Sequence, residues 1–179
     1  EITIIQEKQI GPTLGQEGVK KGVYASIIAL IAITLFMIVY YKISGLFTTL
    51  TIISCLALLF ALMSLINTTL TLPGVIGIVL TIGMCVDANV LIFERIRENF
   101  KNNSENPKSE GFNAAYVTIL DSNLTTLFAA VFLFAFGFGP IRGFSISLII
   151  GIMSSLIVTY IILKLFINAT PERLLGLQK

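Results

Sequence analysis

Residues Leu72 to Phe100 read LPGVIGIVLTIGMCVDANVLIFERIRENF, and this stretch decides how the rest of the chain is interpreted. From Leu72 to Phe93 it is an apolar run that contains one charged side chain, Asp87. A helix of about 20 residues, at 1.5 Å per residue, crosses a hydrocarbon core of about 30 Å. The stretch therefore predicts a membrane-spanning helix that carries a carboxyl group inside the bilayer.

The composition of the whole chain agrees with a membrane protein. The 179 residues are 55% hydrophobic and 12% charged, whereas soluble domains are about 25% charged. The net charge of +2 gives no sign of nucleic-acid binding, and we expect none. Because the chain has no His, proton chemistry must use carboxylates. Cys55 and Cys85 lie in apolar runs and are predicted to be free, buried thiols.

Five apolar runs predict an all-α fold, a polytopic bundle of five transmembrane helices, in a domain that covers residues 22–167. The predicted spans are about 22–42, 46–66, 72–94, 111–138 and 142–164, with a hydrophilic loop at 95–110. Residues 1–21 are predicted to be a periplasmic junction segment, and residues 168–179 a cytoplasmic tail. The chain starts at Glu1 without a signal-peptide pattern, which indicates an excerpt of a longer protein.

The distribution of Lys and Arg predicts the orientation of these spans, because cytoplasmic loops carry an excess of both. Eight lie on the side of the 95–110 loop and four on the other side. The first group is Lys42, Arg95, Arg97, Lys101, Lys108, Lys164, Arg173 and Lys179; the second is Lys8, Lys20, Lys21 and Arg142. This count predicts a multi-pass protein of the cytoplasmic membrane with a cytoplasmic C-terminus.

Asp87 is the first candidate for a functional residue. It precedes Arg95 by eight residues, which places it about 12 Å of helix rise inside the charged boundary. A charged Asp at the centre of a spanning helix costs roughly 2.5–3.5 kcal/mol on insertion scales, so it needs a partner helix, a wet cavity or a proton. We predict that Asp87 carries protons.

The fourth run supplies polar groups at a similar depth. The segment TILDSNLTTLF (118–128) holds Asp121, Asn123 and Thr125, and Asp121 lies about 15 Å from the start of its span at Gly111. Antiparallel neighbouring helices would bring this band beside Asp87 and Asn89. The small residues Gly83, Ala88, Ala114 and Ala115 are expected to allow close helix approach.

Each candidate also has a structural interpretation, which the residues alone leave open. Asp121 is either a second acid of the proton path or a protonated acid that hydrogen-bonds its neighbours. Thr125 is expected to contribute interhelical hydrogen bonds, as hydroxyls in spans commonly do. Arg95, with Glu94, Arg97 and Glu98, is either an anchor at the interface or part of a cytoplasmic proton exit.

Three segments resemble the membrane region of the SecD subunits in the SecD/SecF protein-export family, within the resistance-nodulation-division (RND) superfamily. They are EKQIGPTLGQEGVKKG (7–22), the run LPGVIGIVLTIGMCVDANVLIFERIREN (72–99), and DSNLTTLFAAVFLFAFGFGPIRGFSISLIIGIMSS (121–155). The resemblance covers nearly the whole chain, and VDANVLIFERIRE is its most specific part. Cys85 departs from it, because a small residue such as Ala is expected there.

The resemblance implies a function. Family members of this kind carry six spans in each of two pseudo-symmetric halves, so the first span and the large periplasmic domains would be missing here. It implies a non-enzymatic subunit that couples proton flow to preprotein export across the bacterial inner membrane, with Asp87 in the proton path. It also implies SecF, the SecYEG channel, YidC and a translocating preprotein as partners, and no cofactor or metal besides the coupling proton.

Three other functions are compatible in part with these residues. An RND-type small-molecule exporter would use similar acids, but we expect it to lack the DSNLTT segment. An intramembrane aspartyl protease needs a Gly-x-Gly-Asp pattern, which GMCVD does not provide. A non-conducting membrane scaffold for translocon partners would hold Asp87 as a buried structural acid. Of the three, the residues argue least against the scaffold.

Overall fold

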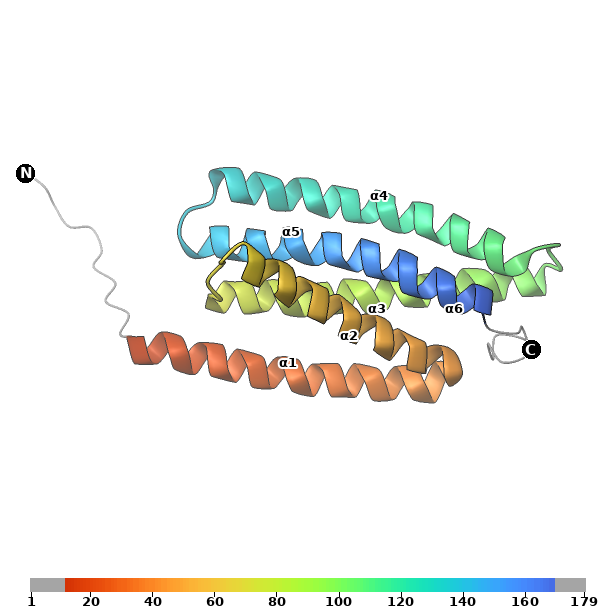
Figure 1. Cartoon of the computed structure of the whole chain (residues 1–179), viewed down its shortest axis with the longest axis horizontal. Coiled ribbons are helices and arrows are strands. Elements are labelled where there is room, and N and C mark those ends of the chain that lie inside the picture. Colours follow the sequence, from red (N-terminus) through yellow and green to blue (C-terminus); the bar gives the residue numbers. More distant parts are fainter. Residues whose placement is uncertain (1–11, 170–179) are drawn as a thin grey trace, which may run out of the picture.

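The computed structural model of the chain describes residues 12–169, and these form five long helices joined by short connections (Figure 1). The helices are α1 (Pro12–Tyr41), α2 (Ile43–Leu65), α3 (Leu72–Lys101), α4 (Pro107–Phe136) and α5 (Pro140–Val158). A π-helical turn, Thr159–Leu163, and α6 (Lys164–Ala169) continue α5. The first 11 residues of the predicted junction segment and residues 170–179 of the predicted tail lie outside the described residues.

The predicted fold class is confirmed over the described part of the chain. Residues 12–169 contain helices and no strand, and five helices are long and apolar enough to cross a membrane. Large apolar side chains remain exposed on all five, for example Phe36 on α1, Phe60 on α2 and Phe132 on α4. An apolar outer surface of this kind is suited to lipid.

The hydrophilic connection is shorter than predicted. We expected a loop at 95–110, but α3 continues to Lys101 and α4 begins at Pro107, so that only residues 102–106 connect them. The helix continues through the polar residues 95–101, where ion pairs three residues apart stabilise it. Arg95 pairs with Glu98 at 3.0 Å, and Arg97 pairs with Glu94 at 3.5 Å. Polarity thus indicated where the apolar run ends, not where the helix ends.

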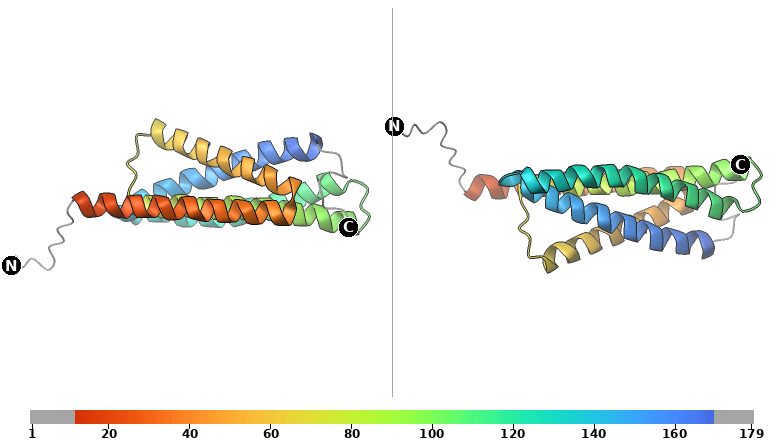
Figure 2. Two further views of the ribbon diagram at one scale, coloured as in Figure 1. Left: turned by 90° about the horizontal axis from the view of Figure 1, so that it is seen from below. Right: turned by 90° about the horizontal axis from the view of Figure 1, so that it is seen from above.

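The helices run alternately up and down, and α3 is the central one, in contact with each of the other four (Figure 1). The bundle has two ends. We call the end with the 66–71 and 137–139 connections the Arg142 end, and the end with Lys42 and the 102–106 connection the Arg95 end. At the Arg142 end α2 leans away from α5, as Figure 2 shows in both views.

Local sequence features explain where the helices start and turn. Proline lies in the first turn of α3, α4 and α5, where its missing N–H is not needed. The Thr71 side chain caps α3 by accepting a hydrogen bond from the Gly74 N–H at 3.2 Å. Between α1 and α2 the chain reverses at Lys42, and Gly45 follows because any Cβ there would collide with the Met37 carbonyl.

Small residues bring helices together, though not all the ones we predicted. Ala88 and Ala115 are buried as expected, but Ala114 and Gly83 are exposed, and a Cβ on Gly83 would meet nothing within 4 Å. The closest approaches instead involve Gly111 on α4 and a series on α5. Gly143, Ser147 and Gly151 of α5 face Thr71, Gly77 and Thr81 of α3. The α5 residues are four apart, as are Gly77 and Thr81 on α3, and the N-cap Thr71 extends this stripe of contacts to the start of α3.

Candidate functional site

The candidate site is built on the antiparallel pair α3 and α4. Gly111 sets their separation, because a Cβ at this position would lie 2.7 Å from the Cα of Ile96. Because the two helices are antiparallel, the next pairs along the contact follow at four-residue steps. Ala115 of α4 then lies opposite Ile92 of α3, and Ile119 lies opposite Ala88. All four of these residues are buried. The two helices therefore pack closely from the Arg95 end toward their centres.

At the centres of α3 and α4 the close packing gives way to a groove of about 200 Å³. Helix α3 contributes Met84, Asp87, Ala88 and Leu91, and α4 contributes Ile119, Ser122, Asn123 and Thr126. Asp87 lies at the middle of the 30-residue helix α3, roughly 22 Å of helix rise from each end. Asp87 lies within the apolar part of α3, which ends at Phe93, so the groove lies within the part of the bundle that is suited to the hydrocarbon region.

The two most polar groups in this groove differ in their surroundings. The Asp87 side chain is exposed, and no described residue is hydrogen bonded or ion paired with it. Asn123 is 6% exposed and forms the inner wall. The Ser122 and Thr126 hydroxyls donate to carbonyls of their own helix, Ile119 at 3.1 Å and Ser122 at 3.2 Å, so their acceptor lone pairs remain available to the groove.

Asn89 is not brought into this groove. Two residues after Asp87 on a helix, it points to the other side of α3, where it is fully buried. Its Nδ2 donates to the Cys85 carbonyl at 2.8 Å, and its Oδ1 has no hydrogen-bond partner among the described residues. Asn89 therefore lies within the chain's own core and is not a neighbour of the Asp87 carboxylate.

Asp121 and Thr125 lie on α4 outside the groove. Both are exposed, and the Thr125 hydroxyl donates to the backbone carbonyl of Asp121 at 3.2 Å. Of the groove residues, Asn123 and Thr126 point to the other side of the helix from Asp121, and Ser122 lies about 100° around it. Asp121 and Thr125 are therefore not among the residues that line the groove beside Asp87, and a role for Asp121 in the proton path stays a prediction.

Arg95 lies two helical turns beyond Asp87 and forms an exposed ion pair with Glu98 at 3.0 Å. The neighbouring acid Glu94 is bound from two sides, by Arg97 at 3.5 Å and by the Tyr41 hydroxyl of α1 at 2.9 Å. The hydrogen bond between Tyr41 and Glu94 joins two helices, and the sequence did not predict it. It ties α1 to the central helix.

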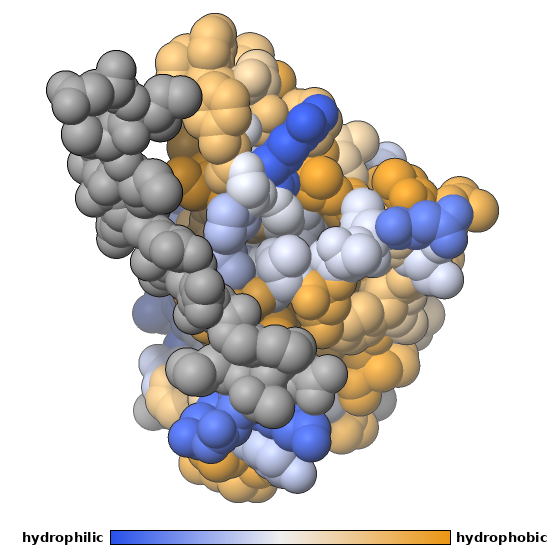
Figure 3. All heavy atoms as spheres, turned by 90° about the vertical axis from the view of Figure 1, so that its left-hand side faces the viewer, coloured by the Kyte–Doolittle hydropathy of each residue, from blue (hydrophilic) through white to orange (hydrophobic). Residues whose placement is uncertain are grey.

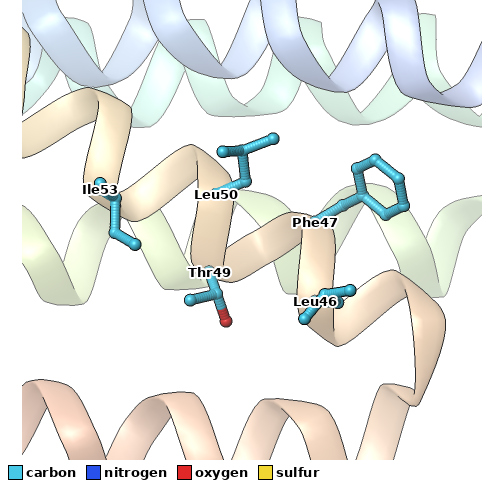
Figure 4. A pocket seen from close by; sticks show the side chains of 5 residues that line it. All are labelled: Leu46, Phe47, Thr49, Leu50 and Ile53. Atoms are coloured by element: carbon cyan, nitrogen blue, oxygen red, sulfur yellow. The ribbon is translucent and has the colours of Figure 1, made fainter.

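A larger hollow, of about 340 Å³, lies on the surface of α2 (Figure 4). It is lined by Leu46, Phe47, Thr49, Leu50 and Ile53, none of which titrates. The Thr49 hydroxyl donates to the Gly45 carbonyl of its own helix at 3.1 Å. This hollow offers van der Waals contact and no titratable group, so the α3–α4 groove remains the candidate site.

The sequence alone did not show that Ser122 and Thr126 line the same groove as Asp87. The signal was present in their spacing, since positions 119, 122, 123 and 126 lie on one face of a helix. Choosing that face over the one with Asp121 and Thr125 required the register of the α3–α4 pair. Gly111 sets that register. The described residues contain no cluster of three or more potential His, Cys, Asp or Glu metal ligands.

These features define a polytopic helical membrane protein with an acid in a mid-helix groove. Comparison with known proteins makes this specific. Residues 1–170 match the family described as "Protein export membrane protein SecD/SecF, C-terminal". The chain belongs to this family.

Individual relatives agree. The chain is 46% identical over 157 residues to the protein translocase subunit SecD of Calditerrivibrio nitroreducens, and 47% identical over 180 residues to that of Rickettsia typhi. These alignments cover 87% and 97% of this chain. The crystal structure of SecDF, a translocon-associated membrane protein from Thermus thermophilus, superposes with a TM-score of 0.83 at 38% identity over 89% of this chain.

The chain is short beside these proteins. It spans 30% and 35% of the two SecD relatives and 23% of the SecDF chain. The similarity therefore concerns a membrane region that in each of those proteins is accompanied by further polypeptide.

Proposed function

We propose that this chain is the membrane region of a SecD-type subunit that promotes protein export across the bacterial inner membrane. In this proposal protons pass by way of Asp87 into the cytoplasm, and their passage drives movement of a periplasmic domain. The C-terminus and the Arg95 end face the cytoplasm. The partners are SecF or a SecF-like half, the SecYEG channel, YidC and the translocating preprotein.

The observation that carries the proposal is an exposed Asp87, without a hydrogen-bond or ion-pair partner among residues 12–169, at the centre of the central helix. Lipid is a poor neighbour for a carboxyl group, because neither its charge nor its hydrogen-bonding atoms are satisfied there. A second protein half that covers the α3–α4 groove would supply the missing partners. An acid at such a boundary can exchange protons with a hydrated path and alter how the halves fit together.

The test replaces Asp87 in the full-length subunit, expressed with its partner half. We expect Asp87→Asn to abolish the part of reporter-preprotein secretion that depends on the proton gradient, because the amide cannot take up or release a proton. Glu105→Gln is the matched control, since Glu105 is an exposed carboxylate in the 102–106 connection. It should leave secretion unchanged.

The same experiment separates this function from that of a non-conducting scaffold. A scaffold needs only the shape and polarity of the groove, which Asn preserves. If Asp87→Asn supports full, gradient-dependent secretion, the proton role is wrong and the scaffold function remains. Complex assembly, measured by co-purification of the partner half, should be retained in the variant.

A further inference from the structure

Another cavity, of about 320 Å³, lies at the Arg142 end, separate from the α3–α4 groove and from the hollow on α2. Its polar wall comes from the α2–α3 connection, with Asn67, Thr69 and Thr71. Its other walls are Arg142 at the start of α5 and the apolar side chains Met63 and Ile146. It lies where α2 leans away from α5, as the two views of Figure 2 show.

The lining of this cavity favours a negatively charged ligand. Arg142 is charged, and none of the described lining residues is acidic. Among the described residues at this end the one acid is Glu17, which is already paired with Lys21 at 3.0 Å. Helices α3 and α5 both start at the cavity, and helix N-termini also favour negative charge.

Donor groups remain free at the cavity. The Arg142 guanidinium carbon lies 4.7 Å from the centroid of the Phe134 ring, a stacking contact that leaves its N–H groups at the edge available. Asn67 and Thr69 are exposed, and their side chains have no hydrogen-bond partner among the described residues. An oxyanion at this position could therefore accept several hydrogen bonds, including a two-pronged pair from arginine.

The position of the cavity along the helices indicates which kind of anion could bind there. Three of the membrane-spanning helices have an end here, α2 at Leu65, α3 at Leu72 and α5 at Pro140. The ends of helices that cross a bilayer lie near its headgroups. Figure 3 looks onto this end and shows pale atoms in the middle of a largely orange surface, with blue atoms above them and at the right edge. Met63 and Ile146 supply an apolar wall below the polar one, as the junction between a phosphate and its acyl chains requires.

The proposed membrane orientation does not explain why an arginine lies at the Arg142 end. In the proposed orientation the Arg142 end faces outward, whereas lysine and arginine concentrate in cytoplasmic loops. Arg142 forms no ion pair within the described residues. A functional ligand at this end would account for a cation there.

We propose that this cavity binds the phosphate of an anionic phospholipid in the leaflet at the Arg142 end. Arg142 holds the phosphate, Asn67 and Thr69 donate to its oxygens, and Met63 and Ile146 contact the first part of the acyl chains. The lipid fills the angle between α2 and α5. This inference does not depend on proton transport by Asp87.

The test measures binding of phosphatidylglycerol to the full-length protein in detergent by native mass spectrometry, with phosphatidylcholine as the neutral reference. Wild-type protein should prefer phosphatidylglycerol. Arg142→Gln should weaken this binding about tenfold, the loss expected for one charge-assisted pair. Lys20→Gln removes one exposed positive charge from the same end outside the cavity and should change binding less than about twofold.

Two further measurements test the same cavity independently of Arg142→Gln. Thr69→Glu places a carboxylate in the exposed connection, and it should weaken phosphatidylglycerol binding even if Arg142→Gln fails to fold. Glycerol phosphate, the free headgroup, should not displace the lipid at equal concentration. The proposal is overturned if wild type shows no preference, if the Lys20 and Arg142 variants behave alike, if both cavity variants bind normally, or if glycerol phosphate competes as well as the lipid.

Discussion

Asp87 on α3 and Asn123 on α4 line the same groove, and they differ in burial: Asp87 is exposed, whereas Asn123 is 6% exposed. The buried amide belongs to the packing between the two helices. The exposed Asp87 carboxyl group lies on the outer surface of the chain, where a neighbouring protein or lipid could contact it. The polar wall behind Asp87 thus comes from α4, and the open side of the groove faces away from the chain.

A hydrated groove should be detectable with a water-soluble thiol reagent. Ser122 lines the groove and is exposed, while Leu124 is exposed on the other side of α4 at nearly the same depth. In the full-length protein we expect Ser122→Cys to react with a charged maleimide roughly ten times faster than Leu124→Cys, because the reactive thiolate forms poorly in an apolar environment. Both native cysteines are buried and should contribute little background.

Equal labelling rates for Ser122→Cys and Leu124→Cys would contradict a hydrated groove. The protein in which both positions keep their native residues is the control for reaction at Cys55 and Cys85. Labelling in the presence of the partner half reports whether that half covers the groove, since a covered Ser122→Cys should then be protected while Leu124→Cys is unaffected.

Asp121 should matter less than Asp87. It lies at mid-helix on α4 but is not among the groove-lining residues, and its backbone carbonyl accepts a hydrogen bond from the Thr125 hydroxyl. We therefore expect Asp121→Asn to reduce gradient-dependent preprotein secretion by a smaller factor than Asp87→Asn in the same full-length complex. An equal loss from the two substitutions would assign Asp121 to the proton path itself.

The sequence predicted the number and type of the spans, because five apolar runs of membrane length leave few other arrangements. It also selected Asp87 and Asn123, since polar groups are rare in such runs, and both line the α3–α4 groove; their functional roles stay predictions. It could not choose a face for Asn89, Asp121 or Thr125. That choice depends on helix rotation and register, which Gly111 and the α5 glycines set through contacts between residues far apart in sequence.

The link between α1 and α3 can be tested at Tyr41. Its hydroxyl donates to Glu94 at 2.9 Å, and its ring lies 5.7 Å from that of Phe93. Tyr41→Phe keeps the ring contact and removes the hydrogen bond, so we expect a loss of about 1 kcal/mol in stability and faster hydrogen exchange in α1. Tyr40→Phe, at an exposed neighbour, is the control. Identical α1 exchange in the two variants would show that the hydrogen bond does not hold α1.

The closest approach of α3 and α4 gives the sharpest structural prediction. A Cβ at Gly111 would lie 2.7 Å from the Cα of Ile96 and 2.8 Å from its nitrogen, so backbone atoms, which cannot rotate away, would have to move. Gly111→Ala should therefore push the two helices apart and lower stability by about 1–3 kcal/mol, the usual range for overpacking. Thermal unfolding of the full-length protein in detergent measures this loss.

Gly83→Ala is the matched control, because a Cβ at Gly83 meets nothing within 4 Å and alanine is the better helix former. It should leave the melting temperature unchanged or raise it slightly. Since Gly111 also sets the register that places Ser122 and Asn123 beside Asp87, Gly111→Ala should reduce secretion as well, whereas Gly83→Ala should not. If both alanine variants unfold at the wild-type temperature, the α3–α4 contact does not have the close geometry on which the groove depends.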